Sequence, residues 1–458
     1  MVTASLVTLA EGDIPARTQM GAALGFHIVF SCFGIAFPTI VLAAHWRGIR
    51  HGDAAALLLA RRWSKVMAVT FAVGAVSGTV LSYELGLLWP GLMGTYGSAF
   101  GIPFAIEGIW FFLEAIFTAI YLYGWRRLSA WAHWWAGTPM VVAGALGALA
   151  VVSANSWMNV PSGFVLRDGR IVSVNAWSVI FNAATPYEVP HMVLAAYMVA
   201  GFVVAAVYAV GMLRGRRNHY HRLGFGIAFA TGAIAAPIQV VVGDIAARAV
   251  AAQQPAKFAA MELIDRTGTN VTEWLGGIYY QGQVYFGVGI PGLGSLLAGS
   301  PRLIGWEDFP PELRAPLPNL IHLTFDGMVV IGLALMLLGA WQGWVWRFRH
   351  TTLTTRWFLI PAALSGIGAV VAMEFGWIVT EVGRQPWTVY GLLLTRDAVT
   401  TAGGVPVTLG ATIAIYAVLT GICIGVPWLM SRRWRREDPR LEEYETTPYG
   451  PPVPEAGS

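Results

Sequence analysis

The stretch MVLAAYMVAGFVVAAVYAVGML, residues 192–213, contains no charged side chain and decides the fold class. A hydrocarbon core about 30 Å thick takes about 20 apolar residues of helix to cross. Lipid cannot satisfy backbone polar groups, so a run of this kind must be a helix rather than an open strand. The stretch therefore predicts a transmembrane helix within residues 188–213.

Comparable windows recur along the rest of the chain. Together the windows cover residues 20–45, 66–88, 103–124, 135–155, 188–213, 225–245, 320–341, 358–380 and 409–431. The composition agrees, because 56% of the 458 residues are hydrophobic and only 12% are charged, which is too little charge for a water-soluble surface. We therefore expect an all-α integral membrane protein with about nine transmembrane helices in one bundle.

Lysine and arginine gather in alternate connections and in the C-terminal segment. These places hold 19 of the 29 basic residues: Arg47, Arg50, Arg61, Arg62, Lys65, Arg126, Arg127, Arg214, Arg216, Arg217, Arg222, Arg347, Arg349, Arg356, Arg432, Arg433, Arg435, Arg436 and Arg440. The positive-inside rule then places the N-terminus outside and the C-terminus in the cytoplasm. Because the charges are scattered over five short segments, they indicate anionic lipid as their partner and no nucleic acid.

This topology divides the chain into four parts. Residues 1–245 contain the first six helices, and residues 246–319 form a long extracytoplasmic connection rich in Pro and Gly. Residues 320–431 contain the last three helices. Residues 432–458, which end in TTPYGPPVPEAGS, have the composition of a disordered cytoplasmic tail.

Ionisable residues inside the predicted spans are few, and each is a candidate functional residue because charge is costly in lipid. They are His27, Glu84, Glu107, Glu114, His191, Asp244, His322, Asp326, Glu374 and Glu381. With the orientation above, most of them fall in the outer halves of their spans, and only Glu114 and Asp326 reach towards the middle. This clustering predicts that the chemistry lies near the outer membrane surface.

Imidazole and thioether groups together can hold haem iron. Met328 lies about as deep in the seventh span as His191 lies in the fifth, so this pair could clamp one haem between two helices. A single membrane histidine is more often hydrogen-bonded to a neighbouring helix, and methionine is common packing material. Secondary transporters also bury carboxylates, but their sites lie near the midplane and often accompany inverted repeats. No such repeat is visible here.

Several motifs resemble subunit I of cytochrome bd-type quinol oxidases. The strongest is EFGWIVTEVGRQPW, Glu374–Trp387, whose GRQPW element is highly specific to that family. The resemblance extends from Arg17 to about the ninth span. It includes RTQMGAALGFH (residues 17–27), GIPFAIEGIWFFLE (101–114), NSWMNVP (155–161) and AKFAAMELID (256–265).

The resemblance implies a haem-bearing subunit of a terminal respiratory oxidase that oxidises quinol and reduces O2 to water. It implies three haems: a low-spin haem b, a high-spin haem b, and a haem d or further haem b. By matching positions, His27 and Glu381 look like ligands of the two high-spin haems, and His191 and Met328 like the low-spin pair. Trp377 and Arg384 fall at positions near the haems, and Lys257 and Glu262 match loop residues associated with quinol oxidation.

Glu107 and Glu114 match an acidic pair associated with proton delivery and oxygen reduction. Their spacing of seven residues is about two helical turns, so both lie on one face, as a relay requires. Protons taken from the cytoplasm would then generate a proton gradient. The resemblance further implies a second membrane subunit, in some relatives small single-span subunits, and a bacterial cytoplasmic (inner) membrane location.

The sequence departs from the family pattern at two places. Asp326 stands where some members have a basic residue, and a carboxylate there does not neutralise a haem propionate. The segment Asn159-Val160-Pro161 lacks the glutamine of the usual loop. The alternative to an oxidase is a b-type membrane cytochrome that only transfers electrons and has no oxygen-reducing site.

Overall fold

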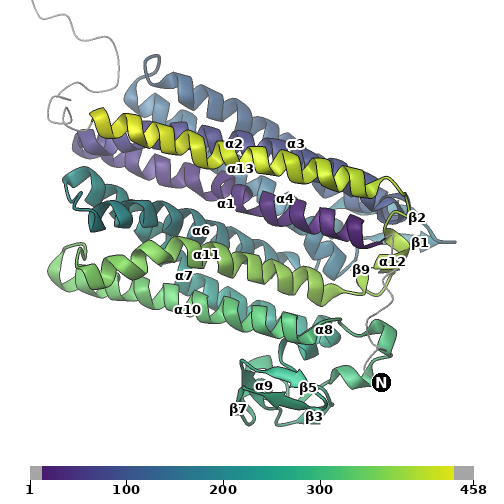
Figure 1. Cartoon of the computed structure of the whole chain (residues 1–458). Helices are drawn as coiled ribbons and strands as arrows, with labels where there is room; N and C mark the ends of the chain where they lie inside the picture. Colours follow the sequence, from purple (N-terminus) through teal and green to yellow (C-terminus); the bar gives the residue numbers. More distant parts are fainter. Residues whose placement is uncertain (1–12, 438–458) are drawn as a thin grey trace, which may run out of the picture.

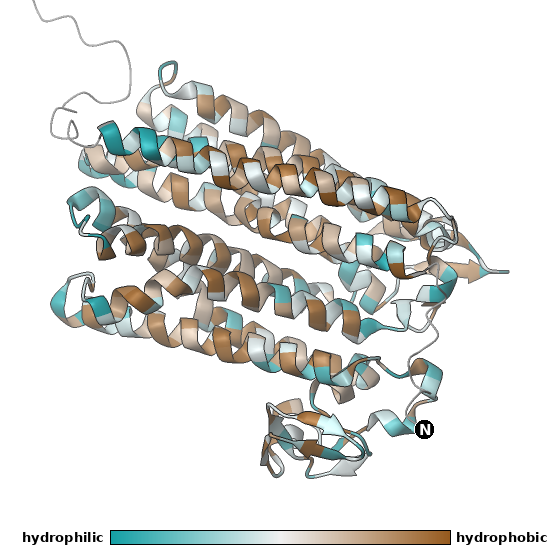
Figure 2. Ribbon diagram, viewed as in Figure 1, coloured by the Kyte–Doolittle hydropathy of each residue, from teal (hydrophilic) through white to brown (hydrophobic). Residues whose placement is uncertain are grey.

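The computed structural model describes residues 13–437 of the chain. Within this range nine helices are long and apolar enough to cross a membrane, which confirms the predicted all-α membrane fold. They are α1 (Asp13–His51), α2 (Ala54–Leu88), α3 (Pro90–Gly124), α4 (Ala130–Asn159), α6 (Thr185–Leu213), α7 (His219–Gln253), α10 (Pro318–Arg349), α11 (Arg356–Arg384) and α13 (Val405–Glu437). Figure 1 shows these helices side by side in one bundle, and Figure 2 shows hydrophobic residues along their lengths.

The helices extend beyond the predicted windows. Helix α3 begins at Pro90, although its window began at residue 103, and α7 continues to Gln253, inside the segment predicted as a loop. Helix α13 continues to Glu437, so the prediction of disorder is wrong for residues 432–437, and residues 438–458 lie outside the described part. Hydropathy locates only the lipid-crossing part of a helix. Backbone hydrogen bonds continue the helix into the interface, where polar side chains are tolerated.

One end of the bundle carries short turns between the helices. Between α1 and α2 the chain turns at Gly52, which has a φ of 63° that favours glycine. Asp53 then caps α2 by accepting a hydrogen bond from the backbone N of Ala56 (3.2 Å). Asn218 caps α7 in the same way, through the backbone N of His221 (3.1 Å). These turns hold neighbouring helices antiparallel.

The other end carries the longer connections, which contain small elements (Figure 1). Between α4 and α6 lie β1 (Phe164–Arg167), β2 (Arg170–Val174) and α5 (Ala176–Ile180). Between α11 and α13 lie β9 (Trp387–Val389), β10 (Leu393–Leu394) and α12 (Thr395–Ala398). The connection between α7 and α10 contains α8 (Pro255–Met261), β3 (Gly268–Thr269), β4 (Glu273–Leu275), β5 (Ile278–Tyr280), β6 (Gln283–Tyr285), β7 (Val288–Ile290), α9 (Leu293–Ala298), β8 (Arg302–Leu303) and two 3-10 turns, Trp306–Asp308 and Pro311–Leu313.

Helix α6 lies inside the bundle, where it packs against α1, α4, α7 and α11. Its closest neighbour is α7. A Cβ built at Gly201 of α6 would lie 2.6 Å from the backbone N of Gly232 and 2.8 Å from the backbone O of Ala228. Small residues therefore allow the two helices to meet backbone to backbone, as is common in membrane bundles.

Candidate functional site

His27 lies on α1 at its contact with α2. The ring nitrogens hydrogen-bond to serine hydroxyls, with Nδ1 2.9 Å from Ser77 Oγ and Nε2 2.9 Å from Ser31 Oγ. A Cβ built at Gly78 would lie 2.8 Å from His27 Cε1, so the ring occupies a space that only glycine leaves open. The imidazole is thus held in one position, and it can release one nitrogen from a hydroxyl to bind a metal centre.

His191 and Met328 lie on α6 and α10, which belong to a group of four helices together with α7 and α11. His191 Nε2 is 3.3 Å from Gln239 Nε2 of α7, and its buried Nδ1 has no hydrogen-bond partner. Met328 faces α11, where a Cβ built at Gly376 would lie 3.0 Å from its sulfur. Both side chains therefore point at neighbouring helices of the same group, and the Nδ1 of His191 is left without a partner.

Glu381, near the end of α11, lies in a buried polar network. Arg384 Nη2 is 2.5 Å from Glu381 Oε2, and Asn155 Nδ2 donates to Glu381 Oε1 (2.7 Å). Asn159 accepts from Arg384 Nη1 (3.5 Å) and donates to Glu188 Oε1 (2.8 Å). We call this set of five side chains, completed by Lys257, the Arg384 network. It joins α4, α6, α8 and α11 at one end of the bundle.

Lys257 enters the same network from α8. Its Nζ donates to the backbone oxygen of Thr380 (3.5 Å), and its aliphatic chain fills the space beside Gly383, where a Cβ would lie 2.9 Å from Lys257 Cγ. Burial lowers the pKa of Lys257, Arg384 lowers it further, and Glu188 opposes the shift. The amine is thus a buried cation placed between two carboxylates and a guanidinium.

Glu262 follows α8 and faces a different cluster. Its carboxyl group hydrogen-bonds to that of Glu273, the first residue of β4. Burial raises the pKa of Glu262 well above its ordinary value, and Glu273 and then Asp326 raise it further. Two carboxyl groups in contact cannot both ionise readily, so the Glu262–Glu273 pair retains one proton between them.

Asp326 and His322 of α10 connect this carboxyl pair to the bundle. Asp326 Oδ2 accepts from the backbone N of Gly276 (2.5 Å) and lies 3.5 Å from His322 Nε2. His322 Nε2 is 3.1 Å from the backbone O of Gly276, and its Nδ1 is 2.7 Å from the backbone O of Met261. Asp326 therefore points to the long connection and attaches it to α10. Lys257 and Glu262, which both match family residues associated with quinol oxidation, face two separate clusters.

Glu107 and Glu114 both lie on α3. Glu114 is buried and faces Gly34 of α1, where a Cβ would lie 3.6 Å from its Oε1, and Glu107 is half-buried. Gly34 lies in the middle of α1, which agrees with the prediction that Glu114 reaches towards the middle of the bundle. Trp377 of α11 packs against the main hydrophobic core.

A model of the cytochrome bd terminal oxidase subunit I family matches residues 15–437. The chain belongs to this family. It is 33% identical over 415 residues to a putative cytochrome bd menaquinol oxidase subunit I of Bacillus subtilis, covering 88% of this chain and 93% of that protein. It is 26% identical over 434 residues to cytochrome bd ubiquinol oxidase subunit 1 of the same organism, covering 89% and 91%.

The fold is also similar to a solved structure of bd oxidase from Geobacillus thermodenitrificans. The TM-score is 0.85 at 33% sequence identity, and the match covers 92% of this chain and 98% of that one. The prediction of a bd-type terminal oxidase subunit is therefore confirmed.

Membership of a cytochrome family implies haem, and the residues present fit such a group. His191 has a buried ring nitrogen without a partner, and Arg384, which suits a carboxylate such as a propionate, has an unpartnered buried Nε. Gly78, Gly376 and Gly243 stand directly against His27, Met328 and His191, so each candidate ligand packs on a glycine of the neighbouring helix.

Four residues of these clusters were not identified from the sequence. Asn155 and Asn159 lie inside the NSWMNVP motif, and their spacing of four places both on one helix face. Glu188 lies three residues before His191, at the start of its span, and was not counted among the intramembrane acids. Glu273 is one of several acidic residues in the long connection, and nothing in the sequence distinguishes it from the others.

The space beside Met328 gives a first prediction. Gly376→Val places a branched side chain against the Met328 sulfur, so we expect most of the low-spin haem signal in the reduced absorption spectrum to be lost. Gly368→Ala on the same helix is the control, because its Cβ would lie at an ordinary 3.4 Å from Ile331. A full low-spin signal in Gly376→Val would contradict the assignment of Met328.

Proposed function

We propose that this chain is the haem-bearing subunit of a membrane complex that oxidises quinol on its outer side and reduces O2 to water. The observation that carries the proposal is the position of α8, which brings Lys257 into the Arg384 network and Glu262 into a carboxyl pair. One short helix thus connects a proton-accepting group in the long connection with the residues beside Glu381.

We infer that the N-terminus is outside and the C-terminus cytoplasmic. The arginine-rich turns and the last turn of α13 lie at one end of the bundle, and the long connections lie at the other. The family implies the cytoplasmic membrane of a bacterium. It also implies a second membrane subunit, because the relatives are named as first subunits. The proposed complex includes small single-span subunits as well.

We assign three haems to the described residues: one to His191 and Met328, one to His27 and one to Glu381, with Trp377 and Arg384 beside them. Haem supplies electron transfer and an iron that binds oxygen. The protein supplies the ligands and the surrounding charges. Asn155 and Arg384 orient the Glu381 carboxylate through a hydrogen bond and an ion pair.

Quinol releases two protons as it releases two electrons, so its site needs a base. The Glu262–Glu273 pair retains one proton and can accept another. Buried carboxylates of this kind have pKa values raised towards neutral pH, which suits proton transfer. Lys257 holds the other side of α8 in the bundle and fixes where this base lies.

Protons used to make water reach the bundle from the opposite side in this proposal, along Glu114 and Glu107. The two acids lie about two helical turns apart on α3, and Glu114 is the deeper. A proton taken from the cytoplasm and one released outside together separate charge, which generates a proton gradient. The alternative, an electron-transferring cytochrome, has no use for acids at these positions.

Spectroscopy of Glu381→Ala tests the oxidase proposal. We expect one ligand-reactive haem to be lost from the carbon monoxide-difference spectrum, with the low-spin haem retained and oxygen uptake abolished. Thr388→Val, which removes a buried hydroxyl from the neighbouring strand β9, is the control and should keep all haems. A parent protein without any carbon monoxide-reactive haem would support the electron-transferring alternative.

Glu114→Gln tests the proton relay. The amide cannot carry a proton, so we expect oxygen uptake to fall about 10²-fold, in the range usual for loss of a proton-transferring group, with every haem spectrum unchanged. Proton uptake in proteoliposomes should fall in parallel. Thr118→Val, one turn further along the same buried face, is the control. Normal turnover in Glu114→Gln would remove this residue from the path.

Glu273→Gln tests the carboxyl pair. Glu273 raises the pKa of Glu262, so removal of its charge lowers that pKa. Quinol oxidation needs the ionised base, and the acid side of the kcat/KM profile should therefore shift to lower pH. Asp265→Asn, which changes another loop carboxylate, is the control. An unshifted acid limb in Glu273→Gln would show that the pair is not the base.

A further inference from the structure

The long connection contains a stretch without any acidic or basic side chain. Residues 274–301, WLGGIYYQGQVYFGVGIPGLGSLLAGSP, include no Asp, Glu, Lys, Arg or His in 28 positions. A water-exposed surface normally carries charge on about a quarter of its residues. The shorter connection between α4 and α6, at the same end of the bundle, does carry charge: its hairpin contains Arg167, Asp168 and Arg170.

This stretch folds as one hairpin followed by a short helix. β4 pairs with β7 and β5 pairs with β6, in the register Leu275 opposite Val288 and Ile278 opposite Tyr285. Helix α9 follows at once. The hairpin therefore satisfies much of its own backbone hydrogen bonding, which lowers the cost of leaving water.

Both faces of the hairpin are apolar. One face packs inwards, where Trp274, Tyr279 and Val284 contact a small core around Trp306. The other face and α9 expose large apolar side chains: Leu275, Ile278, Tyr280, Tyr285, Phe286, Val288, Ile290, Leu296 and Leu297. Phe286 is 94% exposed and Leu296 70% exposed. A hairpin with one face in water alternates apolar and polar residues. Because both faces of this hairpin are apolar, its exposed face requires an apolar environment other than the Trp306 core.

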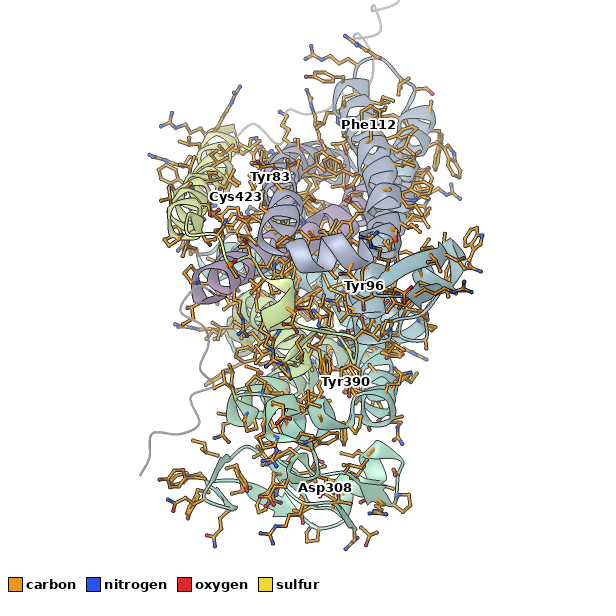
Figure 3. The ribbon with its side chains drawn as sticks, turned by 90° about the vertical axis from the view of Figure 1, so that its right-hand side faces the viewer. Tyr83, Tyr96, Phe112, Asp308, Tyr390 and Cys423 are labelled. Carbon is orange, nitrogen blue, oxygen red and sulfur yellow. The ribbon has the colours of Figure 1, made fainter. Side chains whose placement is uncertain are left out.

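The hairpin lies alongside α10 rather than beyond its end. Gly276, between β4 and β5, bonds through its N to Asp326 and through its O to His322. Asp326 is eight residues after Pro318, the first residue of α10, which corresponds to about 12 Å along the helix axis. Figure 1 shows the small elements beside the outer part of α10, and Figure 3, viewed along the bundle, shows the connection that carries Asp308 to the side of the helices.

Helix α10, which contacts β5 of the hairpin, also begins with exposed apolar residues. Leu317, Leu320 and Leu323, at the start of α10, are exposed apolar residues. Tyrosine and tryptophan favour the interface between headgroups and acyl chains, and the hairpin carries Trp274, Tyr279, Tyr280 and Tyr285. The exposed apolar side chains of the hairpin, its lack of charge and its position alongside α10 all indicate that lipid surrounds it.

We propose that the hairpin 273–290 and α9 are embedded in the interface of the adjoining lipid leaflet, with Phe286 and Leu296 in contact with acyl chains. The occupant of this apolar surface is lipid. This inference does not depend on the proposed reaction. If the proposed reaction also holds, the embedded hairpin places the Glu262–Glu273 carboxyl pair where a lipid-soluble quinol reaches the pair without crossing water.

Spin labels on single cysteines test the proposal. Phe286→Cys and Leu296→Cys carry the test labels, and Glu312→Cys, on an exposed polar position of the same connection, is the matched control. All three are made with Cys423→Ala, and the labelled Cys423→Ala parent is the blank because Cys32 is buried. The whole complex, with its partner subunit, is placed in lipid nanodiscs. Unchanged haem spectra confirm that the variants are intact.

Relaxation of each label by oxygen, which concentrates in lipid, is compared with relaxation by a water-soluble nickel chelate. We expect the oxygen-to-nickel ratio at Phe286 and at Leu296 to exceed that at Glu312 several-fold. A label at either test position that the nickel chelate reaches as readily as Glu312 would overturn the proposal, since water then covers the surface. A label that neither reagent reaches would also overturn it, because a protein partner then covers the surface.

Discussion

The Arg384 network is the arrangement on which one end of the bundle depends. A charge inside an apolar bundle is tolerated only when it is paired, and here two basic groups, Arg384 and Lys257, lie among two acidic ones, Glu381 and Glu188. Asn155 and Asn159 supply the remaining hydrogen bonds. The network holds α4, α6, α8 and α11 together. The network also allows Glu381 to exchange its partner Arg384 for another group. If Glu381 binds iron, the Arg384 guanidinium remains available for another anion.

Helix α8 transmits this constraint to the long connection. One of its sides is held in the bundle by Lys257, and its end presents Glu262 to Glu273 and to the α10 residues His322 and Asp326. The small core around Trp306 then supports the hairpin. The position of the hairpin therefore follows from charges buried at the bundle end. The connection is a folded part of the protein, although its strands are only two or three residues long.

The sequence predicted features that depend on composition over a long window, and it missed those that depend on a single contact. Nine helices follow from hydropathy, because lipid leaves a long apolar run no alternative. Glu188 was missed because a span boundary hid it, although three residues further on His191 was recognised. The hairpin was missed because strands of three residues are too short for alternation to be visible. That Lys257 and Glu262 face different clusters could be seen only in the structure, because a spacing of five residues does not reveal which cluster each side chain faces.

Asp326 shows how a departure from the family pattern acquires a physical meaning. In the sequence it is a carboxylate where some members have a basic residue, and it appears as a defect of a haem site. In the structure it points away from Met328 and attaches Gly276 to α10. The same charge raises the pKa of Glu262. A basic residue at this position would lower that pKa and could not accept the bond from Gly276. The position therefore couples two properties, the attachment of the hairpin and the strength of the base, and a carboxylate here strengthens both.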